Sequence, residues 1–307
     1  MDVSYVYGSR DTSLLYGQSE HVSRSITSAN VDDIVRGRRC DCWIWGLYGD
    51  DGDDDPHPRV MQYLVDTRFY GVYRCGRLVV DLHLIAALVE RWRPETHTFH
   101  FQAGEATVTL EDVALLWGLP VDGLPVTGQD ISWSKEQWQD YCQTWLGYTP
   151  SDRAFKGRRL YATDLAIYLQ HCKITDDSTE QRVQQHVRCL LLLLLGGIMC
   201  PDTSSSAISL LYLRHFEDLE AVRTFSWGSA VLGYLYRELC TGALLRKVVE
   251  QDGTVELDKR KTNLGGALTL LQIWAWSRIP LLAPAIVPVV EDDPRRLAYP
   301  HPPYGAR

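Results

Sequence analysis

The chain lacks the segments that direct a protein into or across a membrane. Its longest apolar run is Cys189–Cys200 (CLLLLLLGGIMC), and this run is too short to cross a bilayer, which needs roughly 20 apolar residues. The first residues, MDVSYVYGSRD, contain no basic stretch followed by an apolar one, and no N-x-[ST] glycosylation acceptor occurs in the sequence. We therefore expect an intracellular protein without a secretory signal and without membrane association.

The sequence also lacks a disulfide framework and an excess of positive charge. Several of its eight cysteines lie in apolar helical patterns, where a thiol acts as a small hydrophobic side chain in a reducing compartment. The net charge is −8, which disfavours non-specific binding to a phosphate backbone. Residues 1–58 hold 5 Arg and no Lys against 11 Asp and Glu, a net of −6; the remaining 26 basic and 28 acidic residues give −2. A nucleic-acid surface would have to be a local patch.

What the sequence does contain is a dense block of local structural signals over residues 84–128. Asp81 can cap a helix that Pro94 prevents from continuing beyond about Trp92. Residues 98–101 and 105–109 alternate in polarity and are rich in β-forming side chains, which predicts a β-hairpin.

A second capped helix follows the hairpin directly. Thr109 is placed to cap it, and Asp112 three residues later makes an approximate capping box. Gly118 is expected to end the helix, because glycine tolerates the left-handed conformation after a last helical turn. Nearly every residue of the block thus has a structural role.

Most of the remaining chain is predicted to be helical. Glu180–Met199 is expected to be the central buried helix, because its second half is apolar on nearly all sides. Tyr70–Tyr73 is expected to be a turn, and Ser226 and Asn263 are expected to cap helices. Gly147 is expected to end one. The other helices are predicted around 60–65, 138–145, 160–169, 231–239 and 268–274.

These signals predict a mainly α-helical fold, a single helical domain with one short β-hairpin. We predict three parts: an acidic, partly disordered and flexible N-terminal arm over 1–58, the domain over 59–283, and a Pro-rich tail over 284–307. Within the arm, Cys40, Cys42, Trp43 and Trp45 form an apolar island expected to dock onto the domain.

Seven motifs along the chain match a known pattern: Glu90–His100 (ERWRPETHTFH), Gly104–Glu105, Leu110–Val113 (LEDV), Gly118–Gly123 (GLPVDG), Leu194–Gly197 (LLGG), Tyr234–Cys240 (YLYRELC) and Leu271–Trp276 (LQIWAW). Together they resemble the plant mobile domain, a family also called aminotransferase-like plant mobile domain. The family includes MAINTENANCE OF MERISTEMS-like proteins and phosphatase 7 long-form homologues. The similarity covers roughly residues 59–283 and departs at a polar insert, Glu250–Lys261.

The resemblance implies a plant protein encoded by a transposable element or by a host gene derived from one. It implies nuclear roles in meristem maintenance, genome stability and transposon silencing. Some members of the family are joined to, or act with, a phosphatase of the plant protein phosphatase 7 type.

The aminotransferase label is not supported by the residues themselves. A pyridoxal-phosphate enzyme needs a Schiff-base lysine and a phosphate cradle. The six lysines of this chain (135, 156, 173, 247, 259 and 261) fall mostly in polar stretches, and no Gly-rich strand-to-helix loop stands out. We therefore expect no such cofactor.

Metal chemistry is also not indicated. Gly49–Asp53 fits one block of a metallophosphatase, G-D-x-x-D, but the D-x-H and G-N-H-E blocks that complete a two-metal site are missing. His97 and His100 are three residues apart, so on a strand they would point to opposite faces and could not share one metal ion. We expect them to form hydrogen bonds around the hairpin.

The polar cluster beside the hairpin is the candidate site. Two arginines that flank a tryptophan can hold a phosphate or stack on a base. The favoured interpretation is structural: Arg91 and Arg93 pair with acidic neighbours and fix the hairpin against the next helix. At the level of sequence, both the binding interpretation and the structural one remain open. The candidate interaction or bracing cluster comprises Arg91, Trp92, Arg93, Glu95, His97, His100, Glu111 and Asp112.

We predict a non-enzymatic nuclear protein that binds partner proteins through aromatic surfaces and uses no cofactor. The expected partners are nuclear proteins, including a phosphatase of the type above. The main alternative is a transposon-encoded accessory protein that contacts nucleic acid directly, and a second is an enzyme whose site no motif reports. Small basic loops, Lys156 with Arg158 and Arg159 and Lys259–Lys261, are expected to be solvated.

Overall fold

The fold is mainly helical. The computed structural model describes residues 15–25, 35–37, 47–48, 55–76, 78–128, 131–201, 207–244, 246–249, 255–258 and 262–284. The helices are α2 (Pro58–Asp66), α3 (Tyr70–Cys75), α4 (Leu82–Val89), α5 (Leu110–Trp117), α6 (Lys135–Leu146), α7 (Ala162–His171), α8 (Glu180–Leu194), α9 (Trp227–Ala243) and α10 (Leu268–Arg278). Helices α2, α4, α5, α6 and α8 begin at residues whose side chains cap them, whereas the side chain of Ser226, expected to cap α9, makes no capping hydrogen bond.

The caps expected at α4 and α5 are present. The Asp81 carboxylate accepts hydrogen bonds from the amides of His83 and Leu84, at 2.9 and 3.1 Å. At α5, Thr109 and Asp112 form a reciprocal capping box, and Gly118 ends the helix with φ = 70°. These contacts satisfy amide groups that the first turn of a helix leaves unpaired.

Two local expectations were wrong. Tyr70–Cys75 is a short helix, α3, and not a turn; five of its six residues are buried, so packing in the core sets its conformation. Asn263 does not cap the last helix. It lies on a strand, and α10 begins five residues later, after the N-cap Ala267.

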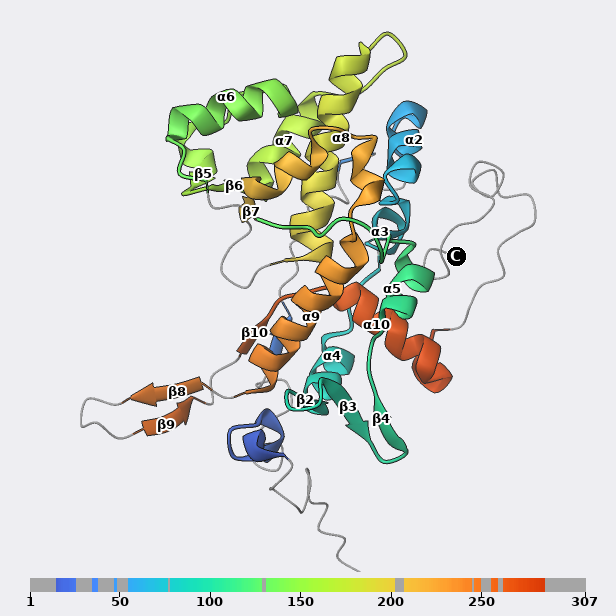
Figure 1. Cartoon of the computed structure of the whole chain (residues 1–307), viewed down its shortest axis with the longest axis vertical. Coiled ribbons are helices and arrows are strands. Elements are labelled where there is room, and N and C mark those ends of the chain that lie inside the picture. Colours follow the sequence, from blue (N-terminus) through green and yellow to red (C-terminus); the bar gives the residue numbers. More distant parts are fainter. Residues whose placement is uncertain are drawn as a thin grey trace, which may run out of the picture.

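The central position expected for Glu180–Met199 is confirmed. Helices α2, α6 and α7 pack around α8 (Figure 1), and its buried residues run from Val183 to Leu194. The helix continues into a π-helical turn, η5 (Leu195–Met199). One hydrophobic core extends from α2 and α8 through α9 to α10.

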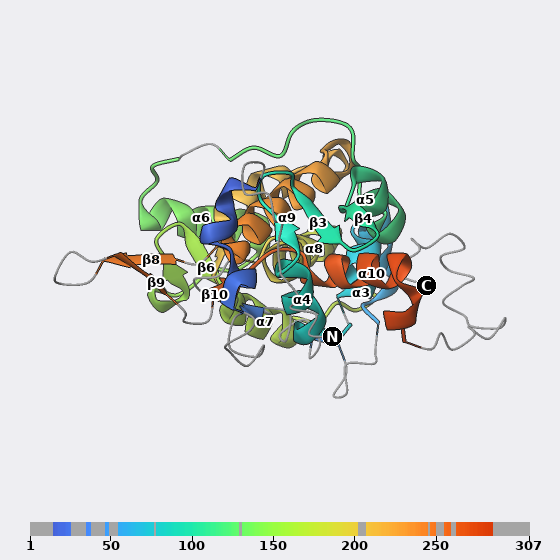
Figure 2. The same ribbon diagram turned by 90° about the horizontal axis from the view of Figure 1, so that it is seen from below.

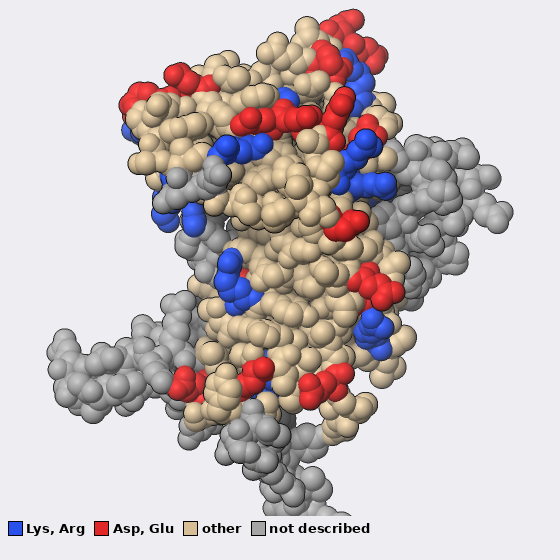
Figure 3. Space-filling view, viewed as in Figure 1, with Lys and Arg blue, Asp and Glu red and all other residues tan. Residues whose placement is uncertain are grey.

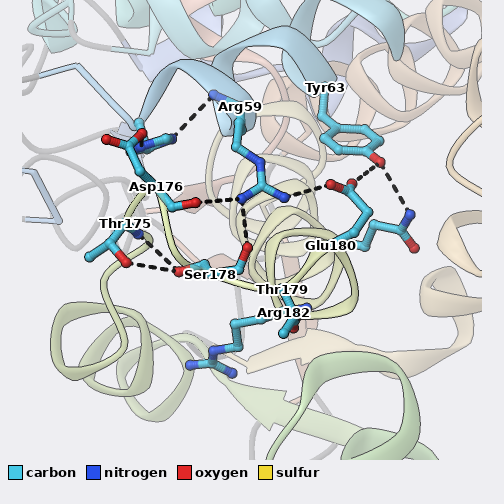
Figure 4. A network of polar contacts seen from close by, with 10 residues as sticks. Arg59, Tyr63, Thr175, Asp176, Ser178, Thr179, Glu180 and Arg182 are labelled. Atoms are coloured by element: carbon cyan, nitrogen blue, oxygen red, sulfur yellow. Dashed lines mark hydrogen bonds and ion pairs between the residues drawn. The ribbon is translucent and has the colours of Figure 1, made fainter.

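A polar network fastens the start of α8 to α2 (Figure 4). Arg59 donates to the Glu180 carboxylate at 2.7 Å and to the Ser178 carbonyl at 2.6 Å. The Tyr63 hydroxyl donates to the other oxygen of Glu180 at 2.6 Å. The hydrogen bonds from Tyr63 and Arg59 lower the pKa of Glu180. The Glu180 side chain also lies in the first turn of α8, where a negative charge interacts favourably with the helix dipole and stabilises the helix.

The second half of the molecule contains α4, α5, α9 and α10. Helix α9 contacts α5 and α4, and α10 contacts the same two helices. Figure 2 shows the chain after α5 crossing one side of the molecule toward α6. On this path Leu124 forms a bridge with Phe225, which holds the connection close to the start of α9.

The mainly α fold is confirmed, and the strands are more numerous than the single hairpin that the sequence predicted. Four small sheets are present among the described residues, and β1 pairs with β10 in parallel across more than 200 positions of sequence. Strands of two to four residues are too short for a periodic signal. The sheets are β1 (Val35–Gly37) with β10 (Thr262–Leu264); β2 (Trp92–Arg93), β3 (Thr98–Phe101) and β4 (Gly104–Ala106); β5 (Phe155–Lys156), β6 (Arg159–Tyr161) and β7 (Ala207–Ser209); and β8 (Arg246–Val249) with β9 (Val255–Asp258).

Short pieces of residues 1–58 belong to the folded body. The 3₁₀ turns η1 (Tyr16–Ser19) and η2 (Val22–Ser25) lie against β2, and Val22 and Leu47 belong to the core. The apolar island at Cys40–Trp45, most of the acidic run, much of the insert 250–261 and the tail beyond 284 lie outside the described residues. The three-part division stays a prediction. Among the helices described, none has the length and hydrophobicity needed to cross a membrane.

Candidate functional site

Trp92 is the buried centre of the predicted polar cluster. Its ring is 0% exposed and makes edge contacts with Phe99 and Tyr236, with centroids 4.8 and 5.1 Å apart. The indole Nε1 donates to the Cys240 sulfur at 3.3 Å. Trp92 therefore joins β2 to β3 and to α9, and its ring cannot stack on a base from solvent.

The two arginines beside Trp92 are in different environments. Arg91 is exposed and its Nη1 donates to the Ala87 carbonyl at 2.6 Å, so it caps the end of α4. Arg93 is buried, and burial lowers the pKa of its guanidinium group, an effect that nearby Glu95 opposes. Because one is exposed and the other is buried, they do not form one surface for a phosphate.

Glu95 connects the cluster to the N-terminal segment. One of its carboxylate oxygens accepts from the Gly17 amide at 2.7 Å. Close by, His21 Nε2 lies 2.6 Å from the Trp92 carbonyl oxygen, so this nitrogen carries the proton and donates. The Nε and Nη1 atoms of Arg93 are buried and have no hydrogen-bond partner among the described residues. These contacts hold residues 17–21 on β2.

The two histidines are separated by the geometry of the hairpin. His97 lies before β3 with φ = 54° and stacks on Tyr236, with centroids 5.7 Å apart and planes at 10°. His100 Nε2 lies 3.5 Å from the Glu105 carboxylate and 3.3 Å from the Thr96 hydroxyl. In the part of the chain that the structure describes, no group of three or more His, Cys, Asp or Glu side chains is arranged to hold a metal ion.

The expected pairing of the arginines with the start of α5 is not formed. Asp112 pairs with Arg278 of α10, whose Nη2 donates to Oδ1 at 2.6 Å, and Glu111 is exposed in the first turn. Sequence reasoning missed Arg278, because it lies 166 positions away from its partner and nothing local marks it.

The positively charged candidates do not form one patch. Strand β2, which directly follows Arg91 in the sequence, lies at the lower end of the molecule, whereas the hairpin β5–β6, whose sequence contains Lys156, Arg158 and Arg159, lies at the upper left (Figure 1). On the face drawn in Figure 3, basic and acidic side chains are interspersed over a mostly uncharged surface. This arrangement does not favour the binding of an extended phosphate backbone.

Sequence reasoning also missed a cavity of about 310 Å³ beside η5. The Cys200 amide donates to the Leu195 carbonyl at 2.7 Å, which closes the widened π-helical turn. Strand β7 packs directly on Gly196, where an added Cβ would lie 2.4 Å from Ile208 Cγ1. A π-helical turn is rare and frequently marks a functional position. In the sequence, the pair Gly196-Gly197 at the end of an apolar helix was the one available sign of this irregular turn.

Two arginines from different elements line this cavity, and none of the described residues that line it is acidic. Arg159 comes from β6, and Arg237 comes from α9, where its guanidinium carbon lies 4.5 Å from the centre of the Tyr234 ring. Burial raises the pKa of Tyr212, and both arginines oppose that rise, so both lie near this hydroxyl.

The fold is thus a mainly helical domain with small sheets and a buried aromatic cluster around Trp92. The chain belongs to the plant mobile domain family, whose model matches residues 68–307. It is 38% identical over 272 residues to a serine/threonine-protein phosphatase 7 long form homolog of Arabidopsis thaliana, covering 89% of this chain and 18% of that protein. It is 31% identical over 274 residues to protein MAINTENANCE OF MERISTEMS of the same plant, covering 88% of this chain and 51% of that protein.

A third relative, protein MAIN-LIKE 2 of Arabidopsis thaliana, is 33% identical over 287 residues, which cover 93% of this chain and 39% of that protein. The chain therefore spans from about a fifth to half of the length of these relatives. No solved structure matches it.

Proposed function

We propose that this chain is a non-enzymatic nuclear protein that acts through protein–protein contacts. Its role lies in meristem maintenance, genome stability and transposon silencing. The partners are nuclear proteins, among them a phosphatase of the phosphatase 7 type. The relatives named for meristem maintenance and for phosphatase 7 support this proposal, and the relative with the phosphatase name is much longer than this chain.

The observation that carries the proposal is a group of exposed leucines near the Asp112–Arg278 ion pair. Leu281 is 93% exposed and Leu282 is 47% exposed, just beyond the end of α10. Leu110, at the start of α5, is 39% exposed and stands two positions before Asp112. We call these three residues the leucine end. Leu110 lies two positions before Asp112, and Leu281 and Leu282 lie three and four positions after Arg278, so each leucine is close in sequence to one partner of this ion pair. A contiguous exposed apolar surface is typical of one that binds another protein.

The polar candidates support a binding role over catalysis. Trp92 and Asp112 are engaged in internal contacts, and the described contacts of His97 and His100 are with residues of the hairpin and α9. A catalytic site instead needs titratable groups that converge on an open pocket.

Affinity purification from plant nuclei tests the proposal. The tagged chain, expressed in plant cells, is expected to be concentrated in the nucleus and to recover nuclear proteins reproducibly, with a phosphatase 7-type protein among them. A reciprocal purification of that phosphatase is expected to recover the chain. Exclusion of the chain from the nucleus, or the absence of nuclear proteins from the purified material, would contradict the proposal.

A further inference from the structure

We propose that residues 15–25 form a strap that detaches from β2 when the buried His21 side chain takes up a proton, while the helical domain stays folded. The strap, dark blue in Figure 1, lies at the lower end of the molecule beside β2. This inference goes beyond the proposed function, because it assigns a proton-controlled change of conformation that partner binding does not require.

The strap is attached to the body of the molecule by a small buried area. Two of its apolar side chains are buried, Leu15 at 5% exposure and Val22 at 0%. The Gly17 amide adds a hydrogen bond to the Glu95 carboxylate at 2.7 Å. A terminal segment that buries so few side chains can open locally at a lower cost in free energy than the core.

His21 fixes the strap to β2 through a neutral ring. It is 1% exposed, and its Nε2–H donates to the Trp92 carbonyl at 2.6 Å. On the other side of the ring, Nδ1 accepts from the Ser23 amide at 3.1 Å, and the Ser23 hydroxyl lies 2.9 Å from the same nitrogen. Because an amide N–H can only donate, Nδ1 carries no proton in this arrangement.

A proton on Nδ1 opposes this arrangement. It would point at the N–H of Ser23, which the backbone holds in place, so a hydrogen bond becomes a contact between two donors. Neither of the described hydrogen-bond partners of His21 is a carboxylate, and a buried charge without a partner is costly. Release of the strap returns the ring to water and removes both penalties.

The surroundings of His21 also disfavour its protonated form. Burial is the largest cause that lowers its pKa to about 4, and the Arg93 guanidinium of β2 is the next. His100 of β3 acts in the same direction, whereas the hydrogen bond to Trp92 and the Glu95 carboxylate act against it. Since Arg93 is itself 4% exposed, a protonated His21 would place a second positive charge beside a buried one.

Release of the strap changes the molecule at β2. Among the described strands, β2 is an edge strand that pairs with β3 alone, and the strap covers its Trp92 carbonyl. When the strap leaves, this carbonyl and the neighbouring Arg93 side chain become accessible to solvent. The closed and detached forms therefore differ at this edge of the sheet and not in the helical core.

Hydrogen exchange of the full chain at about pH 7 and about pH 5, corrected for the intrinsic rates, tests the strap. The amides of Gly17 and Ser23, both hydrogen-bonded in the closed form, report its opening, and residues 190–194 of α8 report the core. A His21 pKa of about 4 in the closed form and about 6.5 in the detached form predicts an opening constant roughly 20-fold larger at pH 5 than at pH 7. The core amides are expected to stay protected.

Two glutamine variants locate the proton. His21→Gln keeps an N–H for the Trp92 carbonyl and an oxygen for the Ser23 amide but takes up no proton, so its strap is expected to open equally at both pH values. His186→Gln is the matched control, because burial also lowers the pKa of His186 to about 4 and this histidine lies on α8. It is expected to open its strap in acid as the wild type does.

Nuclear magnetic resonance titration of the His21 ring in the wild type is a second measurement, which does not depend on how well glutamine fits. We expect the ring to gain its proton together with the loss of protection at Gly17. The proposal is overturned if His21 is protonated while the strap amides stay protected, or if strap and core lose protection together. It is also overturned if folded His21→Gln opens in acid as the wild type does. None of these results bears on whether nuclear partners are recovered.

Discussion

Arg278 reaches from the last turn of α10 to Asp112 in the first turn of α5, with 2.6 Å between Nη2 and Oδ1. The other carboxylate oxygen of Asp112 accepts from the Thr109 amide and hydroxyl, each at 2.8 Å. One buried carboxylate therefore completes a helix cap and joins two helices that are far apart in the sequence. Its side chain is 8% exposed, against 56% for that of Arg278.

This difference in exposure predicts unequal effects of removing the two partners. Asp112→Ala removes the capping box and leaves donors unpaired, so we expect it to lower the free energy of unfolding by about 2–3 kcal/mol. Arg278→Gln removes a solvent-exposed partner and is expected to cost less than about 1 kcal/mol. Urea denaturation followed by circular dichroism measures both values. Equal losses would contradict the dual role of the Asp112 carboxylate.

Two glycines are expected to respond to alanine with opposite signs. Gly118 ends α5 in the left-handed region, with φ = 70°, so Gly118→Ala is expected to destabilise the protein by about 1 kcal/mol. Gly233 lies on the exposed side of α9, and a Cβ there meets no atom within 4 Å. Gly233→Ala is expected to stabilise the protein by roughly 0.5–1 kcal/mol.

The same unfolding measurement reports both glycine variants. Destabilisation of similar size by the two substitutions would show that helix α9 is not formed around residue 233. A neutral Gly118→Ala variant would show that α5 does not end in the left-handed conformation.

Two buried histidines predict a loss of stability in acid. Burial lowers the pKa of His21 and of His186 to about 4, whereas an unfolded histidine titrates near 6.5. Between these values the unfolded chain binds protons that the folded chain does not. Stability is therefore fully present above pH 6.5 and falls as the pH decreases toward 4, by up to roughly 1.4 kcal/mol per pH unit for each histidine.

Substitution with glutamine tests this pH dependence. The side-chain amide of His21→Gln retains a donor for the Trp92 carbonyl, and His186→Gln retains a partner for the Tyr48 hydroxyl, 2.9 Å from Nε2 in the wild type. The double variant is expected to show a flatter dependence of stability on pH between 6.5 and 4.5. His171→Gln, at an exposed position of α7, is the control. An unchanged slope in the double variant would show that other groups take up the protons.

The local parts of this fold could be predicted from the sequence, and the parts that depend on distant residues could not. Asp81, Thr109, Gly118 and Gly147 act within three or four residues of their own position, so capping rules place them correctly. Asn263 was misassigned because its backbone pairs with β1, and no local rule reports that contact.

The candidate site follows the same division. The sequence identified Trp92 and its neighbours as an unusual cluster, but it did not reveal that Trp92 is covered by Tyr236 or that Asp112 pairs with Arg278. The cavity depends on Arg159 and Arg237, which tertiary packing brings together. The sequence analysis placed Arg159 in a solvated basic loop. No local signal shows that Arg159 lines a cavity together with Arg237 of α9.

The proposed role of the leucine end predicts a specific loss of partner binding. The double variant L281E/L282E places two charges on side chains that are exposed in the free protein, so the fold is expected to be retained. Ile167→Glu adds a charge at another exposed apolar position, on α7 in the upper half of the molecule (Figure 1). It serves as the matched control.

The central claim is tested most directly by purifying the wild type, L281E/L282E and Ile167→Glu from plant nuclei. Quantitative mass spectrometry then compares the proteins recovered with each of these three forms. We predict that L281E/L282E recovers its nuclear partners at levels lower by roughly tenfold or more, while Ile167→Glu recovers them as the wild type does. Equal recovery by all three folded forms would contradict the claim that the chain acts through the leucine end.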